Sequence, residues 1–80
     1  MFNTDLLNKV NAQIEKCYDK YGSYASFSEA MAVLEEEHRE LWEEHRKHQL
    51  DFDRIEAEII DNITVLVKMY NDIVLKENRR

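Results

Sequence analysis

The chain of 80 residues contains one glycine, Gly22, and no proline. Because glycine and proline are the residues that most strongly interrupt a helix, their scarcity favours long helices joined by short connections. The hydrophobic share of 44% is too high for a disordered tail. A chain of this length suffices for one domain, so we expect residues 1–80 to form a single all-α domain.

Apolar residues recur at steps of three and four in three segments, residues 5–20, 27–48 and 53–77. A residue type that caps helix N-termini precedes each segment: Asn3 or Thr4, then Ser26, then Asp51 or Asp53. Gly22 is placed to end the first helix. We expect the second to end at Lys47 or His48 and the third at Lys76 or Glu77. The sequence therefore predicts three helices.

The third segment is apolar around more of its circumference than one neighbouring helix covers. Its apolar residues are Ile59, Ile60, Ile63, Val65, Leu66, Val67, Met69, Tyr70, Ile73, Val74 and Leu75. Two short helices of the same chain cannot easily cover them, whereas a second copy of the chain can. We therefore predict a homodimer or higher oligomer with a four-helix bundle at its centre.

The charge balance, 17 acidic against 11 basic residues and a net charge of -6, argues against binding to a nucleic-acid polymer. No stretch of about 18 apolar residues suggests a membrane span. The N-terminal residues lack the pattern of a signal peptide, and Cys17, the one cysteine, has no partner for an internal disulfide. We expect a cytoplasmic protein, with Cys17 packed in the core.

The most informative pattern is acidic. Glu36, Glu37 and Glu40 form an EExxE motif in the second helix, and Glu58 and Asp61 form ExxD in the third. Residues three apart lie on one side of a helix, so the two pairs can face each other across antiparallel helices. Carboxylates gathered there repel one another and raise their own pKa values, a penalty that a divalent cation removes. Ligands that are all oxygen favour Mg²⁺ or Mn²⁺ over zinc.

This order of EExxE and ExxD in a small helical chain resembles the MazG-like all-α nucleoside triphosphate pyrophosphohydrolases, in particular their short phage or bacterial members. Flanking residues 20–30, 33–37 and 40–42 are similar as well, and the resemblance extends over residues 20–74. One departure is the pair His38 and Arg39 inside EExxE, where many members have small residues.

The resemblance implies hydrolysis of a (deoxy)nucleoside triphosphate between its α and β phosphates, giving a monophosphate and pyrophosphate. Carried over by position, Glu37, Glu40, Glu58 and Asp61 would hold Mg²⁺, or Mn²⁺ as a substitute. Glu36 would bind a second ion or orient the attacking water as a base.

Further residues are candidates for contacts with the substrate. Lys68 and Arg54 lie seven residues after and before Asp61, two turns along the same helix face, where each can reach a phosphate. Near the start of the second helix, Tyr24, together with Tyr21 and Phe27, can stack on a base.

Several alternatives stay open. The acidic run can be a solvated face whose glutamates pair with Arg39 or Lys47. His45 and His48 are spaced to share a zinc ion, although such a pair more often ends a helix favourably. Glu35 and His38 form the Glu-x-x-His unit of di-iron bundles. The second functional class is a non-catalytic helical dimer that serves as a binding module.

Overall fold

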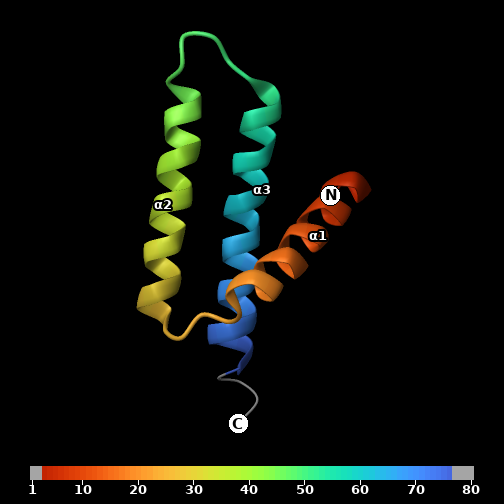
Figure 1. The fold of residues 1–80 in the computed structure, drawn as a ribbon, viewed down its shortest axis with the longest axis vertical. Coiled ribbons are helices and arrows are strands. Elements are labelled where there is room, and N and C mark those ends of the chain that lie inside the picture. The colour runs from red at the N-terminus through yellow and green to blue at the C-terminus, as the bar shows by residue number, and fades with distance from the viewer. Residues whose placement is uncertain (1–2, 77–80) are drawn as a thin grey trace.

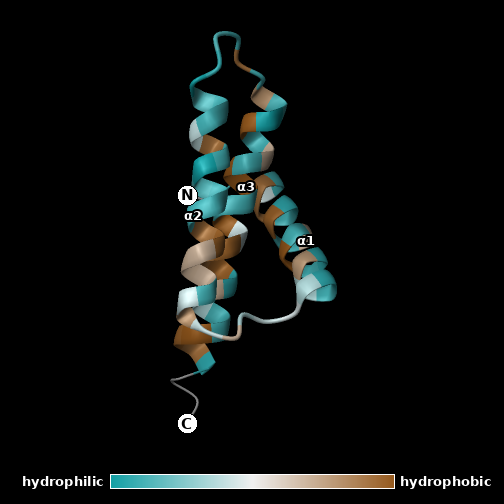
Figure 2. Cartoon of the chain, turned by 60° about the vertical axis from the view of Figure 1, so that its left-hand side comes forward, coloured by the Kyte–Doolittle hydropathy of each residue, from teal (hydrophilic) through white to brown (hydrophobic). Residues whose placement is uncertain are grey.

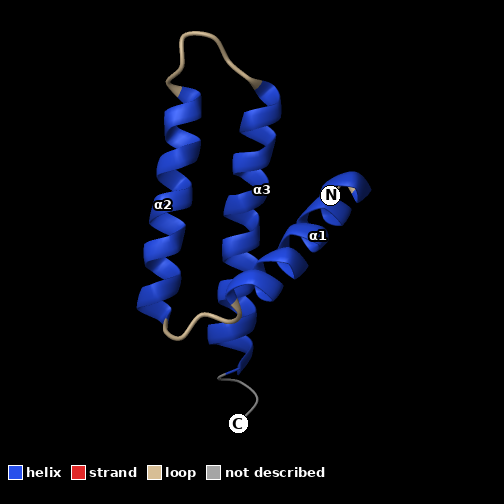
Figure 3. Cartoon of the chain, in the orientation of Figure 1, coloured by secondary structure: helices blue, strands red, loops and turns tan. Residues whose placement is uncertain are grey.

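The chain is all-helical over the part that the structure, a computed structural model, describes, which is residues 3–76 (Figure 3). The helices are α1 (Thr4–Tyr21), α2 (Phe27–His45) and α3 (Phe52–Met69), and α3 continues into a π-helix, η1 (Tyr70–Leu75). The prediction of three helices is confirmed. The alternative end of the third helix at Glu77 lies outside the described residues.

The N-terminal caps form where the sequence places them. Asn3, Ser26 and Asp51 each accept hydrogen bonds from backbone N–H groups in the first turn of the helix that follows. Gly22 ends α1 with a φ of 71°, a backbone conformation that favours glycine, and its N–H donates to the Tyr18 carbonyl oxygen at 2.9 Å. Local sequence therefore determines where the three helices begin and where α1 ends.

The C-termini of the other two helices differ from the prediction. α2 ends at His45, before Lys47, because the Arg46 N–H is shared between the Trp42 and Glu43 carbonyl oxygens, at 3.2 and 3.3 Å, and the last turn tightens.

The second difference is the widening of α3 into the π-helix η1, which replaces the continuous α-helix that was predicted to residue 76 or 77. Within η1, the Asp72 carboxylate accepts hydrogen bonds from the Tyr18 hydroxyl at 2.7 Å and from the Tyr24 backbone N–H at 2.8 Å. The wide turns therefore lie where α3 is bonded to α1 and to the α1–α2 connection.

α3 is the central helix (Figure 1). A short loop turns the chain back so that α2 and α3 run antiparallel side by side, and α1 packs obliquely against α3. The C-terminal half of α2 is mostly hydrophilic (Figure 2). No helix of residues 3–76 combines the length and the apolar character needed to cross a bilayer.

The interior of the described residues is small and partly polar. Its buried hydrophobic residues are Val10, Ala30, Ile60 and Val65. Equally buried are four polar or charged residues, Glu44, Glu58, Thr64 and Lys68. Charged side chains are rarely buried unless they are paired, so each of these needs a partner or a function.

Candidate functional site

The two predicted carboxylate pairs meet between α2 and α3. Glu37 and Glu40 project from α2 and Glu58 from α3, and one carboxylate oxygen from each lies within 4.8 Å of the other two. Asp61 lies one turn after Glu58 on α3, outside this group of three but close enough for the charge of Glu40 to act on it. The antiparallel hairpin thus gathers all four carboxylates in one region.

An amide holds the two helices together at this level. The Asn62 side chain donates from Nδ2 to the backbone carbonyl oxygen of Glu37 at 3.1 Å and to that of Glu58 at 2.7 Å. One amide group thus bonds to the residue on α2 and to the residue on α3 that supply facing carboxylates. Asn62 fixes the register of the hairpin at the acidic cluster.

The cluster contains buried oxygens that bond to nothing. Glu58 is 8% exposed and Glu37 is half-buried, and the Oε2 atoms of both are buried without a hydrogen-bond partner. Glu40 is exposed, which leaves the cluster accessible from one side. A buried carboxylate oxygen without a partner costs free energy unless it is protonated or meets a cation.

The electrostatics follow from this arrangement. Burial first, and then the charges of Glu40, Asp61 and other neighbouring carboxylates, raise the pKa of Glu37 to about 7. Burial and the charge of Glu40 also raise the pKa values of Glu58 and Asp61. Lys16 acts on Asp61, and Arg54 on Glu58, in the opposite direction, without reversing either shift. The cluster is short of positive charge.

The donor set fits a hard divalent cation. Every candidate ligand is a carboxylate oxygen, and Mg²⁺ or Mn²⁺ prefers such ligands. The unpartnered oxygens of Glu37 and Glu58 are the atoms that a cation would satisfy. Carboxylates without a cation are also common on protein surfaces, and this cluster differs from them in the buried, unpartnered Oε2 atoms of Glu37 and Glu58.

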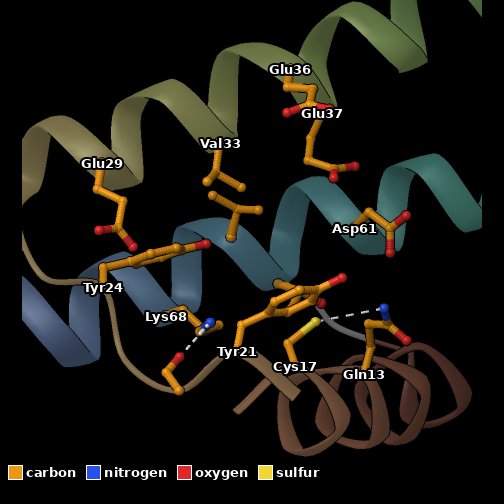
Figure 4. Close-up of a pocket in the computed structure, with 13 residues that line it drawn as sticks. Gln13, Cys17, Tyr21, Tyr24, Glu29, Val33, Glu36, Glu37, Asp61 and Lys68 are labelled. Carbon is orange, nitrogen blue, oxygen red and sulfur yellow. Dashed lines mark hydrogen bonds between the residues drawn. The ribbon is translucent and has the colours of Figure 1, made fainter. Parts of the chain in front are cut away.

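A cavity of about 500 Å³ adjoins the cluster and is lined by residues of all three helices (Figure 4). Glu36, Glu37 and Asp61 lie at one end of it, and Tyr24 and Lys68 lie at the other. Glu36, the predicted base, is exposed and part of the cavity wall. The volume of the cavity is in the range of small-molecule sites.

Lys68 is held in place at the far end. It is 3% exposed, and its Nζ donates to the Gly22 carbonyl oxygen at 3.0 Å. The ammonium lies 4.8 Å from the centre of the Tyr18 ring and 4.4 Å from that of the Tyr24 ring. Burial raises the pKa of Tyr24 to about 12, so its phenol stays protonated at neutral pH. Lys68 and Tyr24, two of the candidate substrate contacts, therefore line the cavity, and the hydrogen bond of Lys68 to Gly22 joins the α1–α2 connection to α3.

Two other predicted substrate contacts do not reach this cavity. The guanidinium of Arg54 is 3.8 Å from the carboxylate of Glu44, and Arg54 is not among the residues that line the cavity. Phe27 lines a separate groove with Met31 and Leu66. Of the aromatic candidates, only Tyr21 and Tyr24 line the cavity.

Ion pairs among the described residues engage some glutamates of α2 and leave Glu37 without one. Arg39 pairs with Glu35 at 3.3 Å, and Lys47 pairs with Glu44 at 2.7 Å. Neither cation pairs with Glu37. The alternative of a solvated face of ion-paired glutamates therefore applies to Glu35, but it does not explain the half-buried, unpaired carboxylate of Glu37.

The histidine alternatives have little geometric support. Across residues 3–76, the group with metal-holding geometry contains carboxylates alone. His45 Nδ1 instead lies 3.2 Å from the Trp42 carbonyl oxygen, and Glu35 of the Glu-x-x-His unit pairs with Arg39. Cys17 is half-buried at the cavity wall rather than in the core, and its Sγ accepts from Gln13 Nε2 at 3.7 Å.

Three residues of this region were not predicted from the sequence: Asn62, Thr64 and Asp72. Thr64 follows Asp61 by three residues and precedes Lys68 by four, so helical spacing alone places it on the face that carries both. Asn62 and Asp72 gave no such signal, since Asn62 bonds to Glu37 on α2 as well as to Glu58 on its own helix, and the partners of Asp72 lie on α1 and on the α1–α2 connection.

Comparison of the chain with protein-family models, with curated proteins and with solved structures finds no match in any of the three. The functional assignment therefore depends on the geometry and on the motif resemblance.

Proposed function

We propose that the chain is a Mg²⁺-dependent nucleoside triphosphate pyrophosphohydrolase, which converts a (deoxy)nucleoside triphosphate into a monophosphate and pyrophosphate. The observation that carries the proposal is the pair of buried, unpartnered carboxylate oxygens of Glu37 and Glu58, which face each other across the hairpin beside a cavity. The EExxE and ExxD motifs, which resemble those of MazG-like enzymes, point to the same activity.

In this proposal Glu37, Glu40, Glu58 and Asp61 hold the cation, and Mn²⁺ can substitute for Mg²⁺. The cation would neutralise charge that develops on the phosphate oxygens and acidify the attacking water. Glu36, which is exposed on the cavity wall, would accept a proton from that water. Asn62 keeps the ligands of the two helices in register through its two backbone contacts.

Pyrophosphate release from a panel of nucleoside triphosphates, with Mg²⁺ or Mn²⁺, tests the activity. Glu37→Gln and Asp61→Asn should each reduce turnover at least about a hundredfold, since a metal ion contributes several kcal/mol to the transition state. Glu35→Gln is the matched control, because Glu35 is exposed and paired with Arg39, and it should retain turnover. A chain that hydrolyses none of the triphosphates with either ion contradicts the proposal.

We also propose a homodimer in which the hairpins of two copies form a four-helix bundle. A groove between α2 and α3 is lined by Phe27, Met31 and Leu66, with exposed fractions of 56%, 48% and 50%. Exposed apolar residues that adjoin one another mark association surfaces, and the small interior of one copy needs more burial. Leu66→Glu should halve the mass measured by analytical ultracentrifugation, whereas a monomeric unaltered chain contradicts the dimer.

The same surface favours the alternative function, a non-catalytic dimerisation module. This alternative has no use for the unpartnered carboxylates, so it predicts neither turnover nor any stabilisation by Mg²⁺ beyond that of a salt at equal ionic strength.

A further inference from the structure

The wall of the cavity, between Asp61 and the Lys68 end, contains a hydroxyl group without a partner. Thr64 is 2% exposed, lines the cavity, and its Oγ1 is buried with no hydrogen bond. A helical threonine commonly bonds back to the carbonyl oxygen one turn earlier, and Thr64 does not. Its hydroxyl is therefore free to bond to a molecule in the cavity.

Lys68 lies one turn further along the same face of α3 and lines the same cavity. An ammonium group has three N–H donors and no acceptor, and one of them goes to the Gly22 carbonyl oxygen. The Tyr18 and Tyr24 rings hold the ammonium in position on two sides. Thr64 and Lys68 thus present two neighbouring donors to whatever occupies this end.

The surroundings select the kind of group that fits. The cavity wall includes four carboxylates, from Glu29, Glu36, Glu37 and Asp61, against the single ammonium of Lys68. This balance disfavours a free phosphate at the Lys68 end. The rings of Tyr21 and Tyr24 and the apolar side chains of Val33 and Val65 also line the cavity, which suits a flat, neutral ring that bears a hydrogen-bond acceptor.

We propose that this end of the cavity holds the base of the substrate, and that Thr64 and Lys68 select bases with a carbonyl oxygen, such as uracil, thymine or guanine, over adenine. A carbonyl oxygen has two lone pairs and accepts from both donors, whereas a ring nitrogen of adenine accepts from one. The inference rests on the proposed function for the identity of the ligand. It assigns to Thr64 and Lys68 a role in specificity that is separate from the carboxylate chemistry.

The test uses binding in place of turnover. Triphosphate analogues with a methylene group between the α and β phosphates cannot be cleaved there, and calorimetry with Mg²⁺ gives their affinities for the full chain. The unaltered chain should bind the uracil and guanine analogues about tenfold tighter than the adenine analogue. Thr64→Val, which keeps the side-chain shape, should remove about fivefold of this preference and leave adenine binding within about twofold. Thr64→Ser, which keeps the hydroxyl, should retain the preference.

Equal affinities for the carbonyl-bearing and adenine analogues overturn the inference, as does a preference that Thr64→Val leaves unchanged or an absence of binding by all of them. Pyrophosphate release measured in parallel separates the two proposals. If the chain releases pyrophosphate but shows no Thr64-dependent preference for carbonyl-bearing bases, only the proposed base site is overturned. A Thr64-dependent preference without turnover supports the base site and overturns the proposed hydrolysis.

Discussion

Glu58 and Lys68 are both charged, both lie on α3, and both are almost fully buried, with exposed fractions of 8% and 3%. Their surroundings are opposite. Lys68 has a carbonyl oxygen and two tyrosine rings around its ammonium group. Glu58 has an oxygen with no partner and further carboxylates as neighbours. The comparison teaches that the chain itself supplies partners for the buried ammonium of Lys68, whereas within residues 3–76 it supplies none for one buried oxygen of Glu58.

The contacts that hold the helices together also differ between the surroundings of Lys68 and those of Glu58. At the Lys68 end, Asp72 accepts from the Tyr18 hydroxyl and the Tyr24 backbone N–H, so α1 and its connection to α2 are tied to α3. Beside the carboxylates, the Asn62 side-chain amide joins the two helices by donating to the backbone carbonyl oxygens of Glu37 and Glu58. These two bonds do not use the carboxylate groups of Glu37 and Glu58.

Removal of the Lys68 ammonium, whose partners belong to the chain, should have the largest effect on stability. Lys68→Met removes the hydrogen bond to Gly22 and the contacts with two rings, so the free energy of unfolding should fall by about 2–3 kcal/mol. Urea denaturation measures the change. Lys76→Met, at an exposed position, is the control and should stay within about 0.5 kcal/mol. A Lys68→Met variant as stable as the control contradicts the role assigned to the buried ammonium.

The pH dependence of stability should come from the carboxylate cluster. The pKa of Glu37 is about 7 in the folded chain against 4.5 as the ordinary value, so the folded chain binds more protons between these two pH values. The free energy of unfolding without metal should therefore fall as pH rises through this window. We expect a loss of about 1–2 kcal/mol, discounted for the partial exposure of Glu37.

Thermal unfolding across the window measures this loss. The raised pKa values of Glu58 and Asp61 act in the same direction. The Glu37→Gln variant, which cannot titrate at that position, should show a flatter profile. Stability that increases with pH over the same range is inconsistent with uncompensated carboxylates.

Neutralisation of the unsatisfied charge should have a smaller effect, of opposite sign to that of Lys68→Met. Glu58→Gln relieves the repulsion from Glu40 and Asp61 while it keeps the side-chain shape, so the metal-free chain should gain about 1 kcal/mol near neutral pH. Urea denaturation at matched ionic strength measures the gain, with Glu35→Gln as the exposed control. A loss of stability in Glu58→Gln would mean that the carboxylate is compensated after all.

The sequence predicted most of the fold because its signals are local. The caps at Asn3, Ser26 and Asp51, and the stop at Gly22, depend on residues within one turn. The π-helix was missed since Asp72 finds its partners on α1 and on the α1–α2 connection, distant in sequence.

The candidate site was predicted to the same extent and for the same reason. The spacings of Glu37, Glu40, Glu58 and Asp61 are helical, so the sequence alone groups these carboxylates. By contrast, spacing alone placed Arg54 with Lys68, and only the tertiary packing shows that Arg54 lies beside Glu44. The unpartnered state of Thr64 also depends on packing and has no sequence signature.

The most direct test of the central claim is the thermal unfolding midpoint at about pH 8, with and without millimolar Mg²⁺ at equal ionic strength. A ligand at about ten times its Kd adds about 1.4 kcal/mol, and 1 kcal/mol shifts the midpoint by about 4–8 °C in a domain of this size. The account predicts an increase of several degrees in the unaltered chain and in Glu35→Gln, and none in Glu58→Gln. An unaltered chain whose midpoint does not respond to Mg²⁺, or a Glu58→Gln variant that responds equally, contradicts the claim.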